Sequence, residues 1–227
     1  MTDKRLLKCA EFVSGGNIAV DVGTDHAYLP VYLVEEGISP AAIACDIKDG
    51  PLAAAKATVS ASGLDEKISI VKSDGLDEVN LSGVSDVIIA GMGGEMIVSI
   101  LERCEYLKSH KVNLVLQPMT KAHVLRKYLF ENGFSIKQEC AVTSGSFCYT
   151  VINAEFSGEK ISVDDFSLYV GKISNATDDD RKYLENLSRR LRTASLGMKI
   201  SSDKSPQADR LNDICKRIDS YLKGAEK

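Results

Sequence analysis

Short apolar runs alternate with helical segments over residues 17–158. The runs are rich in Val and Ile and span residues 17–23, 41–47, 67–75, 85–93 and 113–119. Between them, helices are predicted at residues 27–36, 50–62, 94–108 and 121–132, with Asp49 and Thr120 as N-caps and Gly37, Gly63 and Gly133 as ends. Apolar strands that are separated by helices are typical of a parallel sheet buried on both faces. The pattern therefore predicts a doubly wound α/β fold.

The end of this alternation is different, because two strand-like runs follow each other with no helix between them. They cover residues 134–145 and 146–156 and meet near Gly145. Neighbouring strands with a short connection pair antiparallel. A parallel sheet closed by an antiparallel hairpin is typical of a Rossmann-like methyltransferase, whereas a dinucleotide-dependent dehydrogenase usually keeps its sheet parallel. We therefore predict the methyltransferase form of the sheet.

A helical hairpin is predicted beyond Gly158, where apolar residues recur at alternating spacings of three and four. Each set places one apolar stripe on a helix. The stripes consist of Leu184, Leu187, Leu191, Ala194 and Met198, and of Leu211, Ile214, Ile218 and Tyr221. The stretch "SSDKSPQ" (201–207) separates the two helices. We therefore expect two domains, at residues 1–160 and 161–227, of which the second is a coiled-coil-like pair of α-helices.

Composition fits a globular protein, with 227 residues of which 44% are hydrophobic and 26% charged. No apolar run is long enough to cross a bilayer, and the first residues lack a signal-peptide pattern, so we expect a cytoplasmic protein without a membrane partner. Six cysteines lack metal-ligand spacing, so we expect reduced core residues and no metal. They are Cys9, Cys45, Cys104, Cys140, Cys148 and Cys215. We expect a monomer, with a weak dimer as the alternative.

Charge is distributed unevenly along the chain, whose formal net charge is −4. The segment from Thr177 onward carries twelve Lys/Arg against nine Asp/Glu, whereas residues 1–176 carry 16 against 23. A more basic tail permits contacts with phosphate groups without demanding them.

Acids and glycines gather where the predicted strands end, which is the edge at which open α/β sheets bind ligands. The strand ends carry Asp21 and Gly23, then Asp46, then Asp74 and Gly75, then Gly91, Gly93 and Gly94, and finally Gln117 and Pro118. Each acid taken alone is equally typical of a helix cap or a solvated loop. Together they predict a nucleoside-binding edge.

The spacing of these residues favours S-adenosyl-L-methionine over NAD as the cofactor. Gly23 supplies a tight turn for close backbone approach, and Asp46, 23 positions later, suits a ribose diol. Asp74 suits the exocyclic amino group of adenine. The second and third glycines that would cradle a pyrophosphate are missing, and acids near the first turn suit a sulfonium cation and an amino-acid head group instead.

The fourth strand ends in "IAGMGG" (89–94), where a methyl acceptor would meet the cofactor. Methyltransferases acting on exocyclic amino groups usually place an Asn or Asp followed by two prolines here, and this chain has no such acceptor. Glycines leave open space, which suits a ring nitrogen that already has an in-plane lone pair. A plain strand-to-helix turn is the alternative interpretation.

A family resemblance rests on several stretches taken together. "LLKCAEFV", "DVGTDHAYLP", "GPL", "IAGMGG" and "LVLQP" occur in this order and resemble the bacterial tRNA (adenine-22, N1)-methyltransferases, the TrmK family. The similarity runs from Arg5 through residue 158. It implies a class I S-adenosylmethionine-dependent fold, a C-terminal helical domain that helps to hold tRNA, and methyl transfer to N1 of an adenine in the D-arm region.

Two positions depart from the family pattern. Met119 follows the Gln-Pro pair where the family commonly has Asn, and Lys48-Asp49 precedes Gly50 where the family commonly has Asn before Gly-Pro. The first departure puts in doubt a hydrogen bond from position 119 to the target base.

Site residues are predicted on this basis in three groups. The catalytic candidates are Asp25 and His26, and His26 has a structural hydrogen bond as its alternative role. The cofactor-binding candidates are Asp21, Gly23, Thr24, Asp25, His26, Asp46, Ile47, Ser73, Asp74, Gly75, Ala90, Gly91 and Met92. The substrate or RNA candidates are Arg5, Lys8, Gly93, Gly94, Gln117, Pro118, Arg189, Arg190 and Arg192. An NAD-linked or nucleotide-binding oxidoreductase and a catalytically idle binding module remain alternatives.

Overall fold

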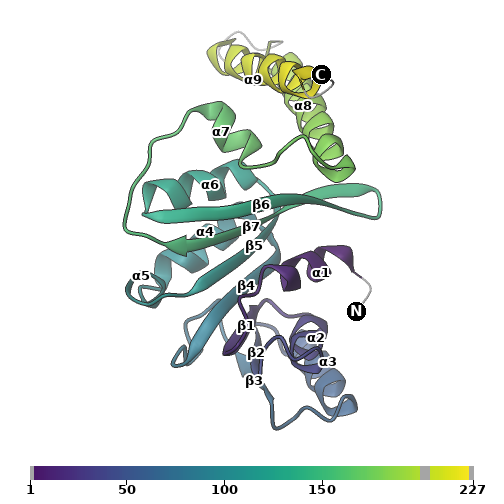
Figure 1. Cartoon of the computed structure of the whole chain (residues 1–227), viewed down its shortest axis with the longest axis vertical. Helices are drawn as coiled ribbons and strands as arrows, with labels where there is room; N and C mark the ends of the chain where they lie inside the picture. Colours follow the sequence, from purple (N-terminus) through teal and green to yellow (C-terminus); the bar gives the residue numbers. More distant parts are fainter. Residues whose placement is uncertain (1–2, 200–204, 225–227) are drawn as a thin grey trace.

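The computed structural model describes residues 3–199 and 205–224 and contains a seven-stranded sheet in the order β3-β2-β1-β4-β5-β7-β6 (Figure 1). The strands are β1 (Ile18–Val22), β2 (Ala42–Asp46), β3 (Ile68–Lys72), β4 (Val84–Gly93), β5 (Asn113–Thr120), β6 (Phe134–Ser144) and β7 (Phe147–Phe156). The first five pair in parallel, and β7 pairs antiparallel with both β5 and β6. This order confirms the predicted parallel sheet closed by a hairpin.

Helices cover both faces of the sheet. They are α1 (Lys4–Glu11), α2 (Tyr28–Glu35), α3 (Asp49–Ala61), α4 (Gly94–Arg103), α5 (Tyr106–Ser109) and α6 (Ala122–Glu131). Side chains alternate along the central strands: Val87 packs with the α4 residue Ile97, whereas the next residue, Ile88, packs with the α1 residue Cys9 and the α2 residue Leu29. This alternation explains the continuously apolar strands, since each of their faces is buried.

One predicted helix is in fact two. The segment 94–108 breaks at Cys104, whose backbone (φ −105°, ψ 86°) leaves the helical region. The break turns the chain so that Leu107 reaches the core beside Leu101. Burial of Leu107 outweighs the local helical preference that the sequence shows.

Both predicted N-caps are wrong. Asp49 is the first residue of α3, and the cap position is occupied by Lys48, whose backbone is extended (φ −99°, ψ 136°) and whose N–H donates to Asp46 Oδ1 at 2.7 Å. Thr120 belongs to β5 and pairs with Gly93, so α6 begins one residue later, after Lys121 in a left-handed conformation (φ 54°).

The six cysteines are free thiols, as predicted. Four of them are buried and the other two, Cys140 and Cys148, are partly buried. Burial raises the pKa of Cys45 and Cys140 to about 12, so both stay protonated at neutral pH. Within residues 3–199 and 205–224, no cluster of His, Cys, Asp and Glu could hold a metal ion, and no helix is long and apolar enough to cross a membrane.

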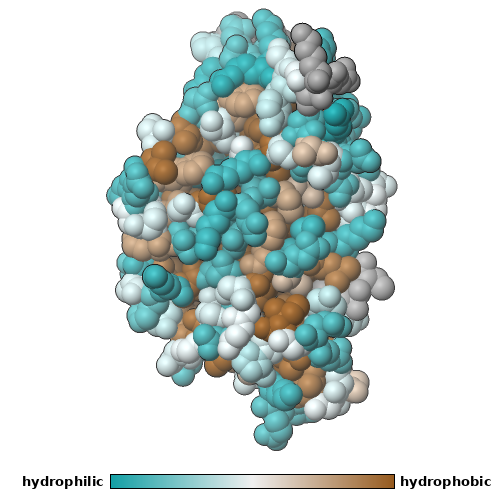
Figure 2. Space-filling view, in the orientation of Figure 1, coloured by the Kyte–Doolittle hydropathy of each residue, from teal (hydrophilic) through white to brown (hydrophobic). Residues whose placement is uncertain are grey.

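Three helices follow the sheet: α7 (Asp165–Val170), α8 (Asp178–Lys199) and α9 (Ser205–Gly224). Hydrogen bonds from Ser195 Oγ to the Ala208 carbonyl and from Ser188 Oγ to Asp219 show that α8 and α9 run antiparallel. The face of this pair that is visible in Figure 2 is mostly hydrophilic. The predicted helical hairpin is therefore present, and residues 201–204 of the predicted separator lie outside the described residues.

The apolar stripes of this hairpin differ from the prediction at two positions. Ala194 is exposed, and the neighbouring Ser195 is buried because its hydroxyl bonds to α9. Tyr221 is partly exposed and packs edge-on against Phe166 of α7. The apolar cluster formed by the C-terminal helices also includes Ala141 of the edge strand β6, so these helices pack on the edge of the sheet. The domain boundary at residue 160 remains a prediction.

A buried ion pair joins these helices to the sheet. Arg126 of α6 and Glu139 of β6 both have fully buried side chains, with an Nη2–Oε1 distance of 2.6 Å. Burial lowers the pKa of Arg126, but the adjacent Glu139 carboxylate outweighs it and raises the pKa above its ordinary value. Arg126 Nη1 also donates to the backbone carbonyls of Leu168 and Tyr169 at 2.7 and 2.8 Å. The end of α7 is thus fixed by a charged side chain of α6.

Gly171 provides a test of this junction. Its φ of 69° is left-handed, and a Cβ there would overlap both Glu139 Oε2 and Arg126 Nε. Disrupting a buried pair costs about 3–5 kcal/mol, so we expect Gly171→Ala to lower the free energy of unfolding in urea by roughly that much. Gly197→Ala is the matched control in open space on α8, and there the change should be neutral or stabilising by about 0.5–1 kcal/mol. Equal stability of the two variants would contradict this account.

Candidate active site

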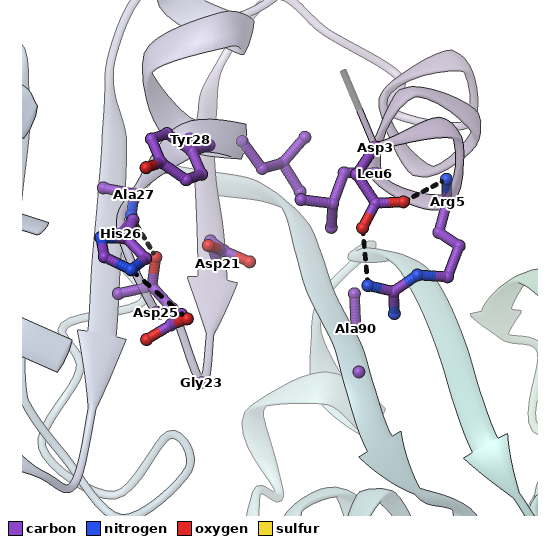
Figure 3. Close-up of a pocket in the computed structure, with 13 residues that line it drawn as sticks. Asp3, Arg5, Leu6, Asp21, Gly23, Asp25, His26, Ala27, Tyr28 and Ala90 are labelled. Carbon is purple, nitrogen blue, oxygen red and sulfur yellow. Dashed lines mark hydrogen bonds and ion pairs between the residues drawn. The ribbon is translucent and has the colours of Figure 1, made fainter. Parts of the chain in front are cut away.

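A cavity of about 710 Å³ lies at the carboxyl ends of β1 and β4 (Figure 3). One wall comes from the turn between β1 and α2, and the opposite wall comes from α1 and the end of β4. The lining residues are Asp3, Arg5, Leu6, Asp21, Gly23, Thr24, Asp25, His26, Ala27, Tyr28, Leu29, Ala90 and Gly91. The cavity therefore brings together predicted cofactor candidates from two strands.

The turn after β1 is tight although it holds a single glycine. Gly23 (φ 77°) and Thr24 both donate their backbone N–H groups to the Cys45 carbonyl, at 2.8 and 2.9 Å. The left-handed φ of Gly23 favours glycine there, and a Cβ would also displace the end of the Met92 side chain. Thr24 Oγ1 in turn accepts from the backbone N–H of Ala27, which has a left-handed φ of 54°. A buried threonine hydroxyl thus stabilises a turn that further glycines usually shape.

Asp21 is the buried acid of the cavity, and only 8% of the residue is exposed. In Figure 3 its carboxylate points into the space between Tyr28 and Leu6. Burial raises the pKa of Asp21 to about 6; Thr24 opposes this shift and the negative charge of Asp46 adds to it. No ion-pair partner of Asp21 occurs in the described part of the chain. A buried carboxylate without a cation suits a positively charged ligand.

Asp25 and His26 lie at the mouth of the cavity. The Asp25 side chain is 82% exposed, and its Oδ2 is 3.6 Å from His26 Nε2. The His26 ring stacks on Tyr28 with 5.1 Å between ring centroids. The mouth therefore presents a negative charge beside a pair of flat rings. Tyr28 was not among the predicted site residues, although it stands in "DHAYLP".

Arg5 and Gln117 meet at the opposite wall. Gln117 is fully buried, and its Oε1 accepts from Arg5 Nη1 at 2.9 Å and from the Gly91 backbone N–H at 3.1 Å. Met119 Sδ lies 3.3 Å from the same Arg5 nitrogen. The guanidinium also lies over the Tyr149 ring, 5.4 Å from its centroid. Two separate strands, β5 and β7, therefore hold Arg5 at the cavity, and Gln117 orients the end of β4.

The predicted ribose and adenine acids lie outside the cavity lining. Asp46 accepts from Lys48 N through Oδ1, and its carbonyl accepts from Ser73 N at 3.0 Å, which places the ends of β2 and β3 side by side. Asp74 forms an ion pair with Arg103 at 2.9 Å, and that pair holds its pKa below the ordinary range. Ser73 and Gly75 form the turn before Asp77, and Ile47 is an exposed apolar side chain next to Asp46.

The remaining RNA candidates are dispersed. Gly93, Gly94 and Pro118 lie where β4 and β5 end. Lys8 forms an ion pair with Glu11 on α1 and does not line the cavity. The three arginines of α8 do not line this cavity. One of them, Arg190, lines a different cleft.

The strand order and the strand-end cavity define the class I methyltransferase fold. A family model described as "Methyltransferase domain" matches residues 2–152, which include the cavity and most of the sheet. The methyltransferase class alone does not identify the substrate or the atom that is methylated. More similar proteins, whose substrates are named, are more informative.

Three relatives cover nearly the whole chain. The tRNA (adenine(22)-N(1))-methyltransferase of Bacillus subtilis (strain 168) is 32% identical over 95% of this chain and 93% of its own length. A Streptococcus pneumoniae protein solved in complex with S-adenosyl-L-methionine is 31% identical, with a TM-score of 0.83 over 96% of this chain and 99% of that chain. M. capricolum TrmK, solved with S-adenosyl-homocysteine, is 27% identical, with a TM-score of 0.80 over 96% and 97%. The chain belongs to the tRNA (adenine(22)-N(1))-methyltransferase family, TrmK.

The burial of Asp21 gives a testable dependence of stability on pH. Its folded pKa of about 6 exceeds the ordinary value of 3.8, so the folded protein binds more protons than the unfolded chain between these values, and Asp21 lowers stability as the pH rises from about 4 to 6. We expect Asp21→Asn to match the wild type below pH 4 and to exceed it above pH 6 by up to roughly 3 kcal/mol in the free energy of unfolding. A difference that stays constant with pH would contradict the assignment.

Proposed function

We propose that this protein transfers a methyl group from S-adenosyl-L-methionine to N1 of adenine 22 in tRNA. The observation that carries this proposal is the end-to-end match with the Bacillus subtilis tRNA (adenine(22)-N(1))-methyltransferase, together with an acid-lined cavity at the strand ends. These findings support methyl transfer over an NAD-linked oxidoreductase or a catalytically idle binding module.

The residues around the cavity fit this cofactor. When bound, S-adenosyl-L-methionine supplies a methyl carbon on a cationic sulfur. Asp21 offers a buried negative charge to the cationic part, and the narrow turn at Gly23 allows close backbone approach. Asp46 keeps its Oδ2 available for a ribose hydroxyl, and Ile47 offers apolar surface to the adenine ring.

The proposed cofactor-binding set is otherwise the predicted one. It consists of Asp21, Gly23, Thr24, Asp25, His26, Asp46, Ile47, Ser73, Asp74, Gly75, Ala90, Gly91 and Met92. Asp74 can accept from the adenine amino group only if it shares its carboxylate with Arg103, because both of its oxygens already bond to that guanidinium. The Arg103 pair therefore orients Asp74 on the rim of the site.

The chemistry needs no deprotonation before attack, because N1 of adenine already has a lone pair in the plane of the ring. The residues must orient the base and stabilise the positive charge that develops on it. Asp25 places a carboxylate at the cavity mouth for this second task. His26, stacked on Tyr28, presents a flat ring that can position the base. Orientation alone can supply about 7–11 kcal/mol of the barrier reduction.

The substrate side of the cavity is formed by the ends of β4 and β5. Gly93 ends β4 with only Thr120 Oγ1 near its missing side chain and leaves room for a flat base, whereas Gly94 is buried against the Lys121 carbonyl. Pro118 follows the buried Gln117. Gln117 already donates and accepts hydrogen bonds within the protein, so we assign it to positioning Gly91 and Arg5. Arg5 and Lys8 would face RNA phosphates from α1.

An assay with unmodified tRNA transcripts tests the substrate and the methylated atom together. Incubation with methyl-labelled cofactor, followed by nucleoside analysis, should yield 1-methyladenosine. A transcript with guanine in place of adenine 22 is the matched control and should remain unlabelled. Label in another nucleoside, or equal label in the control transcript, would refute the proposed position of transfer.

A further inference from the structure

A second cleft, of about 260 Å³, lies between the N-terminus of α6 and one face of α8. Lys121 and His123 enter it from the α6 side, and Tyr169 from the end of α7. Arg190 enters it from α8. Arg126 also lines it, but its charge is already balanced by Glu139. No carboxylate belongs to the lining, so the cleft is positively charged.

This cleft adjoins the catalytic edge of the sheet. Thr120, just before Lys121, pairs with Gly93 in the ladder of β4 and β5. The Lys121 carbonyl packs so closely on Gly94 that a Cβ there would lie 2.5 Å from its oxygen. Lys121 has a left-handed backbone (φ 54°), and this packing holds it in place. Lys121 is therefore fixed next to the end of β4, where we propose that Gly93 faces the target base.

The three arginines of α8, which the sequence did not distinguish, differ in their contacts and in their position relative to the cleft. Arg189 Nη2 donates to Asn186 on the same helix, and Arg192 forms an ion pair with Asp219 of α9. For Arg190, no hydrogen bond or ion pair occurs among the residues that the structure describes. Of the three, only Arg190 lines the cleft, so its guanidinium is the one available for an anion there.

The other polar groups of the cleft suit an anion as well. Lys121 Nζ is 2.6 Å from Glu95, but both side chains are more than half exposed, so solvent weakens this ion pair. A phosphate can therefore compete for the ammonium group. The His123 ring stacks on Tyr169 with 4.4 Å between centroids. Burial, followed by the charges of Arg126 and Lys121, lowers the pKa of His123, so at neutral pH the ring is uncharged and offers a hydrogen bond.

We propose that this cleft binds a phosphodiester of the tRNA backbone between Lys121 and Arg190, and so fixes the RNA to the sheet domain and to α8 at once. The inference rests on the proposed function for the identity of the RNA. Two cations, of which Lys121 alone has a carboxylate partner and that one is exposed, match one phosphate group. A contact of this kind positions RNA without reading its sequence. The substrate would thereby be held on the same edge as the methyl-transfer site.

The test compares two double variants of equal charge. Lys121→Gln with Arg190→Gln removes both cleft cations. The control, Lys127→Gln with Arg189→Gln, removes one cation from α6 and one from α8 that do not line the cleft. Lys127 pairs with Glu131, and Arg189 donates to Asn186. Binding of an unmodified tRNA transcript, without cofactor, is measured by fluorescence anisotropy at several salt concentrations. Each lost phosphate contact makes the slope of log Kd against log salt shallower by about 0.9.

We expect the slope of the cleft variant to be shallower by the amount of one to two phosphate contacts. Its KM for tRNA should rise about tenfold or more, and its affinity for S-adenosyl-L-methionine should stay unchanged. The control variant should show a smaller change in slope. Equal slopes in the two double variants would overturn the inference. The single variants Arg190→Gln and Arg189→Gln give the same comparison if a double variant melts at lower temperature.

This design separates the two proposals. A wild type that binds tRNA but methylates no adenine would refute the proposed function, while a cleft-specific loss of slope would still support the phosphate site. Conversely, normal formation of 1-methyladenosine with no difference between the double variants would refute the cleft alone.

Discussion

Burying the Asp21 carboxylate at the end of β1 without a cation beside it costs the unliganded protein free energy, because desolvation disfavours its charged form. Hydrogen bonds of the surrounding backbone hold it in this position. The turn after β1 donates two backbone N–H groups to the Cys45 carbonyl, and the Thr24 hydroxyl accepts from the backbone N–H of Ala27. Such a site gains most from a cationic ligand. The cost in stability and the proposed affinity for a sulfonium cofactor thus have one physical origin.

A second buried charge sets the position of the C-terminal helices. Arg126 satisfies Glu139 in the sheet and two carbonyls at the end of α7, so the helices are attached through a charge pair that tolerates little displacement. The same junction places α8 opposite the start of α6 and forms the basic cleft. The helical hairpin therefore extends the strand-end edge of the sheet with the surface that we propose to contact RNA.

Much of the fold could be predicted from sequence because local patterns carry it. Uniformly apolar strands, the two adjacent strand runs and the apolar stripes of α8 and α9 all follow from periodicity. The break at Cys104 and the burial of Ser195 in place of Ala194 could not be predicted, because each depends on contacts with distant elements. The acids at the strand ends could be predicted from their spacing along the sequence. The hydrogen bond between Arg5 and Gln117 could not, because these residues are 112 positions apart and no local pattern connects them.

Proton release on cofactor binding tests the central role of Asp21 most directly. Calorimetric titration of S-adenosyl-L-methionine at pH 6, in buffers that differ in ionisation enthalpy, gives the number of protons released. At this pH about half of Asp21 is protonated in the free protein, and a bound cation favours the carboxylate, so the account predicts release of about half a proton. Asp21→Asn should abolish that release and weaken binding. Absence of release in the wild type, or equal release in the variant, would contradict the account.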